Sequence, residues 1–219
     1  MDAIQKTLIG SVMFVMLLIG VVLVFGRAHA APNDTSSALN KHPLTTQVAT
    51  FAGGCFWCME KPFDVLDGVL STTSGYMGGS SKDATYKKVS QGGTDHVEVI
   101  QVKYDPRVVS YATLLTVFWR NIDPKNSRGQ FCDVGSQYRS AVFAHGTEQA
   151  RQANASRARV ESQLGRISTQ VESAATFYPA EAYHQDYYLK NPLRYRYYRS
   201  RCGRDQRLKA LWGDAPSKK

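Results

Sequence analysis

The segment 51–60, with the sequence FAGGCFWCME, constrains the fold of this chain more than any other. A short apolar run is followed by two glycines, which let a strand turn sharply because glycine has no Cβ. Cys55 follows this turn and is predicted to lie at a helix start, where unpaired N–H groups and the helix dipole favour a thiolate. Phe56 and Trp57 would form the apolar wall of a pocket beside it. The pattern indicates a nucleophile that acts on a small, partly apolar target.

Hydrophobic periodicity along the chain predicts alternating strands and helices. The expected strands are 47–53, 69–79, 97–104, 138–144 and 170–177, and the expected helices are 56–66, 111–121, 147–164 and 180–190. Loops are expected at 80–93 and 123–135. Mixed strand pairing with helices on one face predicts an α+β fold, specifically a ferredoxin-like split βαβ plait. After residue 191 we expect an irregular tail, with an apolar stretch at 208–212 that could dock on the core.

The N-terminal residues have the composition of an export segment. An unbroken apolar run of residues 8–25 follows Lys6, and Ala28-His29-Ala30 provides a small-x-small cleavage site. We interpret residues 1–30 as a signal peptide or, since the run is barely long enough to span a bilayer, as an uncleaved anchor. Residues 31–46 are polar and are interpreted as a linker. Both readings place the rest of the chain outside the cytoplasm, and the periplasm is the expected location.

The formal net charge is +9, and much of the excess lies in the segment 192–219. The residues that carry much of this excess are Arg194, Arg196, Arg199, Arg201, Arg204, Arg207 and Lys209. We interpret them mainly as a solvated basic tail, with contact to anionic lipid or tuning of Cys202 as alternatives. Tyrosines between the arginines could stack on nucleic acid, but an exported protein rarely meets one, and we expect no such partner.

The chain has four cysteines, at positions 55, 58, 132 and 202. In an exported protein the default interpretation is two structural disulfides. A zinc site would need the Cys55–Cys58 pair plus two isolated cysteines. We therefore expect no metal and no bound cofactor.

At residues 54–57 the sequence GCFW resembles the peptide methionine sulfoxide reductase A family, whose enzymes repair methionine sulfoxide. Further motifs follow in the family's order: 74–79 (SGYMGG), 85–86 (TY), 96–99 (HVEV), 118–119 (FW), 123–124 (DP), 137–140 (QYRS) and 183–185 (YHQ). The resemblance covers residues 47–191, which we take as the catalytic domain. Such an ordered set of motifs is highly specific.

The resemblance implies a role for each matching residue. Cys55 would be the nucleophile, and Phe56 and Trp57 would hold the methyl group of the sulfoxide. The sulfoxide oxygen would be bound by Tyr86, Glu98 and Tyr138, with Asp133 nearby. The family's fold is an α+β plait. Three features depart from the common pattern: Cys58 replaces a glycine, Cys132 is additional, and an Arg-rich segment around Cys202 replaces the glycine-rich tail with its recycling cysteines.

The chemistry sets a condition on each reacting group. A sulfoxide becomes a good electrophile only when its oxygen is protonated, so a thiolate is needed on one side and an acid on the other. Glu98 can be that acid if burial raises its pKa. In strict alternation Glu98 shares a strand face with His96 and Ile100, opposite Val97 and Val99. Tyr86 and Tyr138 would donate O–H groups to the oxygen.

The cycle then needs a second thiol, because attack leaves Cys55 as a sulfenic acid that condenses with a thiol to give a disulfide. The expected order of candidates is Cys202, Cys58 and Cys132, and a relay through two of them is possible. Cys202 comes first because the nearby arginines favour its thiolate. An external thioredoxin-like dithiol would reduce the disulfide.

We expect a monomer that reduces methionine S-sulfoxide, free or in oxidatively damaged proteins. Two other functions remain open. A thiol-disulfide oxidoreductase or isomerase would use residues 55–58 as a Cys-x-x-Cys exchange pair. A non-enzymatic adhesion or membrane-surface module would act through the basic tail, and its binding would be sensitive to salt.

Overall fold

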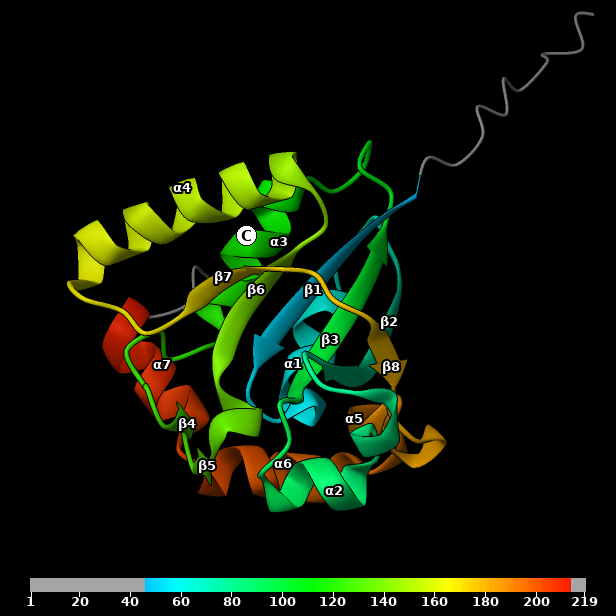
Figure 1. The fold of residues 1–219 in the computed structure, drawn as a ribbon. Helices are drawn as coiled ribbons and strands as arrows, with labels where there is room; N and C mark the ends of the chain where they lie inside the picture. Colours follow the sequence, from blue (N-terminus) through cyan, green and yellow to red (C-terminus); the bar gives the residue numbers. More distant parts are fainter. Residues whose placement is uncertain (1–45, 214–219) are drawn as a thin grey trace, which may run out of the picture. The chain divides into compact units, whose positions relative to one another are not determined.

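A mixed six-stranded sheet organises the part of the chain that the computed structural model describes, residues 46–213 (Figure 1). Its strands lie in the order β7-β6-β1-β3-β2-β8. Their bounds are β1 Gln47–Gly53, β2 Val69–Met77, β3 Val97–Tyr104, β6 Ser140–Ala144, β7 Gln170–Ser173 and β8 Phe177–Pro179. All neighbouring pairs are antiparallel except β6 and β7. The expected α+β class is confirmed.

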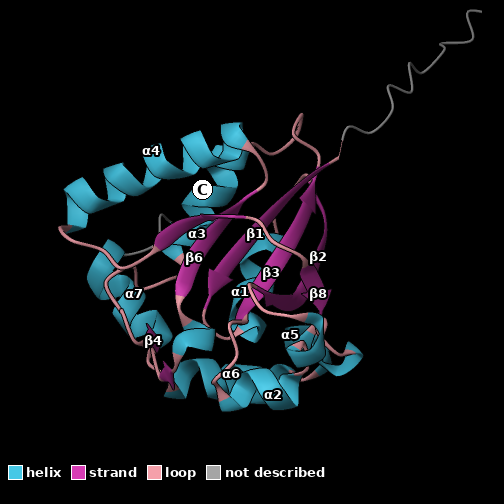
Figure 2. Cartoon of the chain, viewed as in Figure 1, coloured by secondary structure: helices cyan, strands magenta, loops and turns pink. Residues whose placement is uncertain are grey.

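Helices and short helical turns connect these strands (Figure 2). The α-helices are α1 Phe56–Asp64, α2 Tyr86–Gln91, α3 Tyr111–Arg120, α4 Thr147–Leu164, α5 Tyr187–Lys190, α6 Pro192–Arg201 and α7 Arg204–Trp212. Three-residue 3-10 turns are η1 Ser81–Asp83, η2 Ser136–Tyr138 and η3 Ala182–His184. The short strands β4 Gly129–Gln130 and β5 Asp133–Val134 form a separate hairpin within the expected loop 123–135.

The expected signal or anchor at 1–30, and the linker at 31–46 apart from its last residue, lie outside the described residues. Among residues 46–213, no helix combines the length and apolarity that a bilayer crossing requires.

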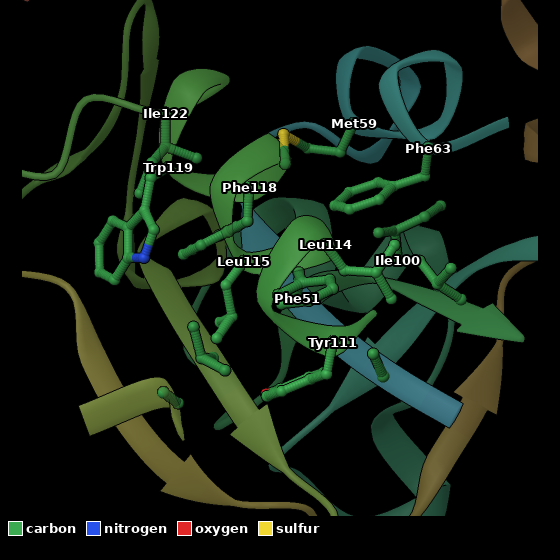
Figure 3. Close-up of a cluster of buried hydrophobic side chains, with 14 of the residues drawn as sticks. Phe51, Met59, Phe63, Ile100, Tyr111, Leu114, Leu115, Phe118, Trp119 and Ile122 are labelled. Atoms are coloured by element: carbon green, nitrogen blue, oxygen red, sulfur yellow. The ribbon is translucent and has the colours of Figure 1, made fainter. Parts of the chain in front are cut away.

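Alternation along the strands separates two apolar layers. One face of the sheet packs against α1, α3 and α4, where Phe51 stacks on Phe63 and Phe118 with ring centroids 5.1 and 5.2 Å apart (Figure 3). The opposite face carries a smaller cluster that includes Val97 and Val99. The predicted facing of β3 is therefore confirmed, because Ile100 lies in the first cluster. Ser110 caps α3 as its sequence position suggests, with its hydroxyl accepting from the Thr113 N–H at 3.1 Å.

Three expectations of secondary structure before residue 191 were wrong. The strand expected at 170–177 is two strands at opposite edges of the sheet, because β7 pairs with β6 while β8 pairs with β2. The loop expected at 80–93 contains η1 and α2, and the helix expected at 180–190 is reduced to η3 and α5.

The tail expected to be irregular is helical. Pro192 is the first residue of α6, a position whose N–H has no partner within the helix, so the lack of an N–H in proline breaks no hydrogen bond. Gly203 and Gly213 follow the ends of α6 and α7 and have φ of 63° and 74°. Only Tyr195 of α6 and Arg204 and Leu208 of α7 are buried, which explains why no apolar period predicted these helices. The expected docking of 208–212 is confirmed, since Trp212 packs against the core.

Candidate active site

A tight turn between β1 and α1 positions Cys55. Gly54 has φ +79°, and a Cβ built there would lie 2.5 Å from the Cβ of Gln130. A Cβ on Gly53 would lie 2.5 Å from the sulfur of Met59. Glycine at 54 is therefore required by conformation and by space, and at 53 the side chain of Met59 occupies the place of a Cβ. Cys55 becomes the N-cap residue of α1, as predicted, and is only 6% exposed.

The carboxyl group of Glu98 lies at the same helix start. Glu98 is on β3, is buried, and accepts a hydrogen bond of 3.0 Å from the N–H of Phe56, the residue after Cys55. Burial raises the pKa of Glu98 to about 8, and the bond from Phe56 only partly opposes this. The carboxyl group therefore keeps its proton at neutral pH while it lies next to the nucleophile.

The two thiols of α1 form a coupled pair. Cys55 and Cys58 are both free, buried and joined by a side-chain hydrogen bond. Burial, that bond and the charge of Glu98 raise the pKa of Cys55 well above its ordinary value. The bond with Cys55, assisted by Arg204 and Arg199, lowers the pKa of Cys58 to about 7. The expected lowering of the Cys55 pKa at the helix start is not found, because burial outweighs it, and Cys58 is the thiol of the pair whose pKa is lowered.

Phe56 and Trp57 occupy an aromatic cluster beside these groups. Trp57 stacks on Tyr187, with ring centroids 3.7 Å apart, and its Nε1–H donates to Nδ1 of His184 at 2.9 Å. Phe56 is buried, and its ring centroid lies 4.9 Å from that of His184. His184 thereby orders both aromatic side chains that the motif placed after the nucleophile.

The two predicted tyrosine donors come from different elements. Tyr86 is the first residue of α2, and Tyr138 is the last residue of η2, directly before β6. Both are half-buried. Burial, Glu98 and Cys55 all raise their pKa values, so both hydroxyls stay protonated and face the same charges as the thiol pair. The structure therefore brings Cys55, Glu98, Tyr86 and Tyr138 together.

Asp133 lies at the edge of this group, in the hairpin that connects to the C-terminal helices. Its carboxylate accepts a hydrogen bond from the hydroxyl of Tyr198 in α6, and its charge contributes to raising the pKa of Cys55. The adjacent Cys132 forms a disulfide with Cys202 at the end of α6. Cys202, the first expected resolving thiol, is therefore paired with the third, and Cys58 is the remaining free thiol beside Cys55.

Several site residues were not predicted. His184 contacts Trp57, Phe56 and Tyr86. The 183–185 motif was the only local signal for it. Glu181 accepts from the N–H of Tyr86 at 2.9 Å, and no local pattern marked its role.

Two groups of metal-ligating side chains gather within the described residues. The first group is Cys132, Asp133 and Cys202, whose two sulfurs are used by the disulfide. The second contains Glu60, which already accepts hydrogen bonds from two backbone N–H groups at the start of α5. Both groups thus have a structural use.

Comparison with known proteins identifies the same region. A family model described as peptide methionine sulfoxide reductase matches residues 47–216. The chain is 52% identical over 169 residues to peptide methionine sulfoxide reductase MsrA 2 of Rhizobium meliloti, which covers 77% of this chain and 84% of that protein.

Two solved structures have a similar fold. Mxr1 from Saccharomyces cerevisiae in its reduced form superposes with a TM-score of 0.66 at 36% identity, covering 69% of this chain and 88% of the other. Methionine sulfoxide reductase A of Corynebacterium diphtheriae gives a TM-score of 0.64 at 33% identity, covering 73% and 81%.

Proposed function

The chain belongs to the peptide methionine sulfoxide reductase MsrA family, and on this premise we propose that Cys55 reduces the sulfoxide with Glu98 as its acid and Cys58 as its resolving thiol. Reduction of methionine sulfoxide by an oxidoreductase is the activity that family membership establishes. The observation that carries the residue assignment is the hydrogen bond from the Phe56 N–H to Glu98, because it holds a protonated carboxyl group beside Cys55.

In the first step the Cys55 sulfur attacks the sulfoxide sulfur while the Glu98 proton passes to the sulfoxide oxygen. The proton of the Cys55 thiol passes to the Cys58 thiolate. The oxygen then transfers to Cys55, which becomes a sulfenic acid, and methionine leaves. Tyr86 and Tyr138 donate hydrogen bonds to the oxygen, and Phe56 and Trp57 hold the methyl group. The hydrogen bond between the two thiols supports this proton transfer.

In the second step Cys58 condenses with the sulfenic acid of Cys55, forming a disulfide and releasing water. Cys58 is free, buried, and has a pKa of about 7, so its thiolate is available at neutral pH. Its N–H donates to the Cys55 carbonyl at 3.0 Å, within the first turn of α1. Cys202 takes no part in this scheme, because it is bonded to Cys132.

The disulfide of Cys55 and Cys58 needs an external reductant. A thioredoxin-like dithiol supplies two electrons and two protons, regenerates both thiols and becomes a disulfide itself. The substrate is the S epimer, free or in proteins, because the two methionine sulfoxide reductase types each act on one epimer. The enzyme acts as a monomer.

The remaining proposals concern location and topology. The apolar run near the N-terminus supports export to the periplasm, with residues 1–30 as a cleaved signal or a tether. The central strand order β6-β1-β3-β2, with antiparallel neighbours, supports a split βαβ plait as the core of the fold. Strands β7 and β8 extend this sheet at its two edges.

The proposal is tested by mixing the purified protein with N-acetyl methionine S-sulfoxide or R-sulfoxide and a small dithiol. We expect turnover of the S epimer only. Equal turnover of both epimers would contradict the substrate assignment, and turnover of neither would contradict the function.

Replacement of Cys58 by serine separates this function from thiol-disulfide exchange. We expect the Cys58→Ser variant, mixed with S-sulfoxide without reductant, still to release one methionine per enzyme, because the nucleophile of the first step is Cys55. Release should be slower than in the wild type, since the Cys58 thiolate that accepts the Cys55 proton is missing. Its Cys55 then stays a sulfenic acid that dimedone traps, whereas the wild type loses two mass units as a disulfide forms. An exchange enzyme would lose all activity in this variant and keep it in Glu98→Ala.

Mass mapping of the oxidised wild type identifies the resolving thiol. We expect a Cys55–Cys58 disulfide together with an intact Cys132–Cys202 disulfide. A Cys55–Cys202 disulfide would instead reinstate Cys202 as the resolving residue. The double variant Cys132→Ser/Cys202→Ser is the matched control, since it keeps both thiols of α1 and should still form their disulfide.

A further inference from the structure

One arginine of the C-terminal helices is buried with its charge. Arg204, the first residue of α7, is 1% exposed. Its Nη1 donates to the carbonyl of Asn121 at 2.7 Å, and its Nη2 donates to the carbonyl of Gly53 at 3.2 Å. Its guanidinium carbon lies 4.1 Å from the ring centroid of Phe131. The guanidinium is therefore held by the fold and differs from the solvated arginines expected in the tail.

Arg204 forms no direct ion pair with a carboxylate of the described residues. Among the ion pairs formed within residues 46–213, Arg199 pairs with Asp205 and Arg207 with Asp123, but none includes Arg204. Burial of a cation lowers the stability of the folded state unless a nearby negative group compensates for the lost hydration. Asp133 provides part of this compensation without a direct ion pair, since the charge of Arg204 opposes the rise of the Asp133 pKa that burial causes.

The thiol pair of α1 is a second compensating group by position. Gly53, whose carbonyl binds Arg204, begins the turn that carries Cys55, and a Cβ on Gly54 would lie 3.6 Å from Nη2 of Arg204. Nη1 lies 3.6 Å from the sulfur of Met59, the residue after Cys58. The guanidinium thus contacts both the turn before the nucleophile and the first turn of α1. Its charge lowers the pKa of Cys58.

We infer that Arg204 is a positioning residue of the reduction cycle, which anchors the turn before Cys55 and stabilises the Cys58 thiolate that attacks the sulfenic acid. The inference rests on the proposed function, in which Cys58 resolves. Arg204 acts through Cys58 and the turn and does not itself react. In the condensation of Cys58 with the Cys55 sulfenic acid, a sulfur–sulfur bond forms, the sulfenic S–O bond breaks, and water leaves.

Other titratable groups also face Cys58 and enter its pH dependence. They are Cys55, Glu98, Asp133, Tyr195, Tyr198 and Arg199. Arg199 is the second cation, but it is engaged by Asp205 at 2.5 Å. Arg204 forms no such ion pair within residues 46–213, and its charge lowers the pKa of Cys58 more than that of Arg199 does.

Loss of this charge has opposite effects at low and high pH. A higher pKa leaves less thiolate below neutrality, but each thiolate becomes a stronger nucleophile. For a rise of about one pKa unit, resolution would slow by about threefold at pH 6 and would become about twofold to threefold faster at pH 9. Simple structural damage would slow resolution at every pH.

The test uses the full chain and N-acetyl methionine S-sulfoxide without reductant, quenched in acid at intervals between pH 5.5 and 9.5. Methionine release reports the first step, and loss of two mass units reports formation of the Cys55–Cys58 disulfide. Arg204→Met and Arg204→Gln remove the charge, and Gln keeps a donor for the backbone carbonyls. Both should show rate profiles that cross that of the wild type. Arg204→Lys keeps the positive charge, so the pH at which disulfide formation reaches half its maximal rate (the midpoint) should equal that of the wild type.

Arg207→Met is the matched control, because it removes a cation of the same helix that pairs with Asp123 and lies outside the thiol pair. Its midpoint should equal that of the wild type. A folded Arg204→Met or Arg204→Gln protein with an unchanged midpoint would overturn the inference, as would a parallel loss at all pH values. Absence of any Cys55–Cys58 disulfide in the wild type would instead overturn the proposed function.

Discussion

Replacement of Cys55 by serine should reduce methionine release to the uncatalysed background. An alcohol at this position cannot be ionised near neutral pH and cannot accept the sulfoxide oxygen as a sulfenic acid. The loss should appear already in a single turnover without reductant, measured by quantifying methionine after an acid quench. It is the largest effect we expect from any single substitution.

The matched control for Cys55→Ser is the Cys132→Ser/Cys202→Ser variant, which removes two other sulfurs of the chain but leaves the thiol pair intact. It should release one methionine per enzyme like the wild type. Methionine release by Cys55→Ser above background would show that another thiol performs the first step, and it would invalidate the site as we describe it.

Replacement of Glu98 by glutamine should slow the first step by roughly 10²- to 10⁴-fold, the contribution of a positioned general acid. Glutamine keeps the size of the side chain but has no carboxyl proton to transfer. The pH profile provides a second readout. Glu98 acts in its protonated form and its pKa is about 8, so the wild-type rate should fall as the pH rises through that value. In Glu98→Gln this fall should disappear.

Glu148→Gln is the control for that measurement, since Glu148 is an exposed residue of α4 that pairs with Arg151. Its single-turnover rate and pH profile should match those of the wild type. A Glu98→Gln protein that is folded and retains most of the wild-type rate would remove Glu98 from the mechanism and leave proton delivery to Tyr86 or Tyr138.

Local patterns predicted the central part of the fold well. The bounds of β1 and α4 were predicted to the residue, because a strand with β-branched residues that ends at two glycines and a long helix between two glycines are strong local signals. The two edge strands were predicted as one, since a local sequence does not contain the information that β7 pairs with β6 while β8 crosses to β2.

The candidate site was accessible from the sequence only where motifs were continuous. Cys55, Phe56 and Trp57 follow a recognisable turn, and Glu98 lies in an apolar strand whose alternation indicates its face. His184, Tyr198 and Arg204 come from the C-terminal third of the chain, where arginines and tyrosines form no apolar period. Their contacts with Trp57, Asp133 and Gly53 span 65 to 151 residues of sequence.

The sequence by itself determined the α+β class, the turn that exposes a cysteine to a helix start, and the chemistry that such a cysteine performs. These features depend on neighbouring residues, whose conformational limits and periodicity are readable in order. Only the tertiary structure decided which cysteines are joined and which thiol is charged. Cys132 meets Cys202 across 70 residues, and Cys58 gains its low pKa from Cys55 and from cations on other helices. The contact between Cys132 and Cys202 and the burial of Cys58 depend on residues that are remote in sequence, so they exist only in the folded chain.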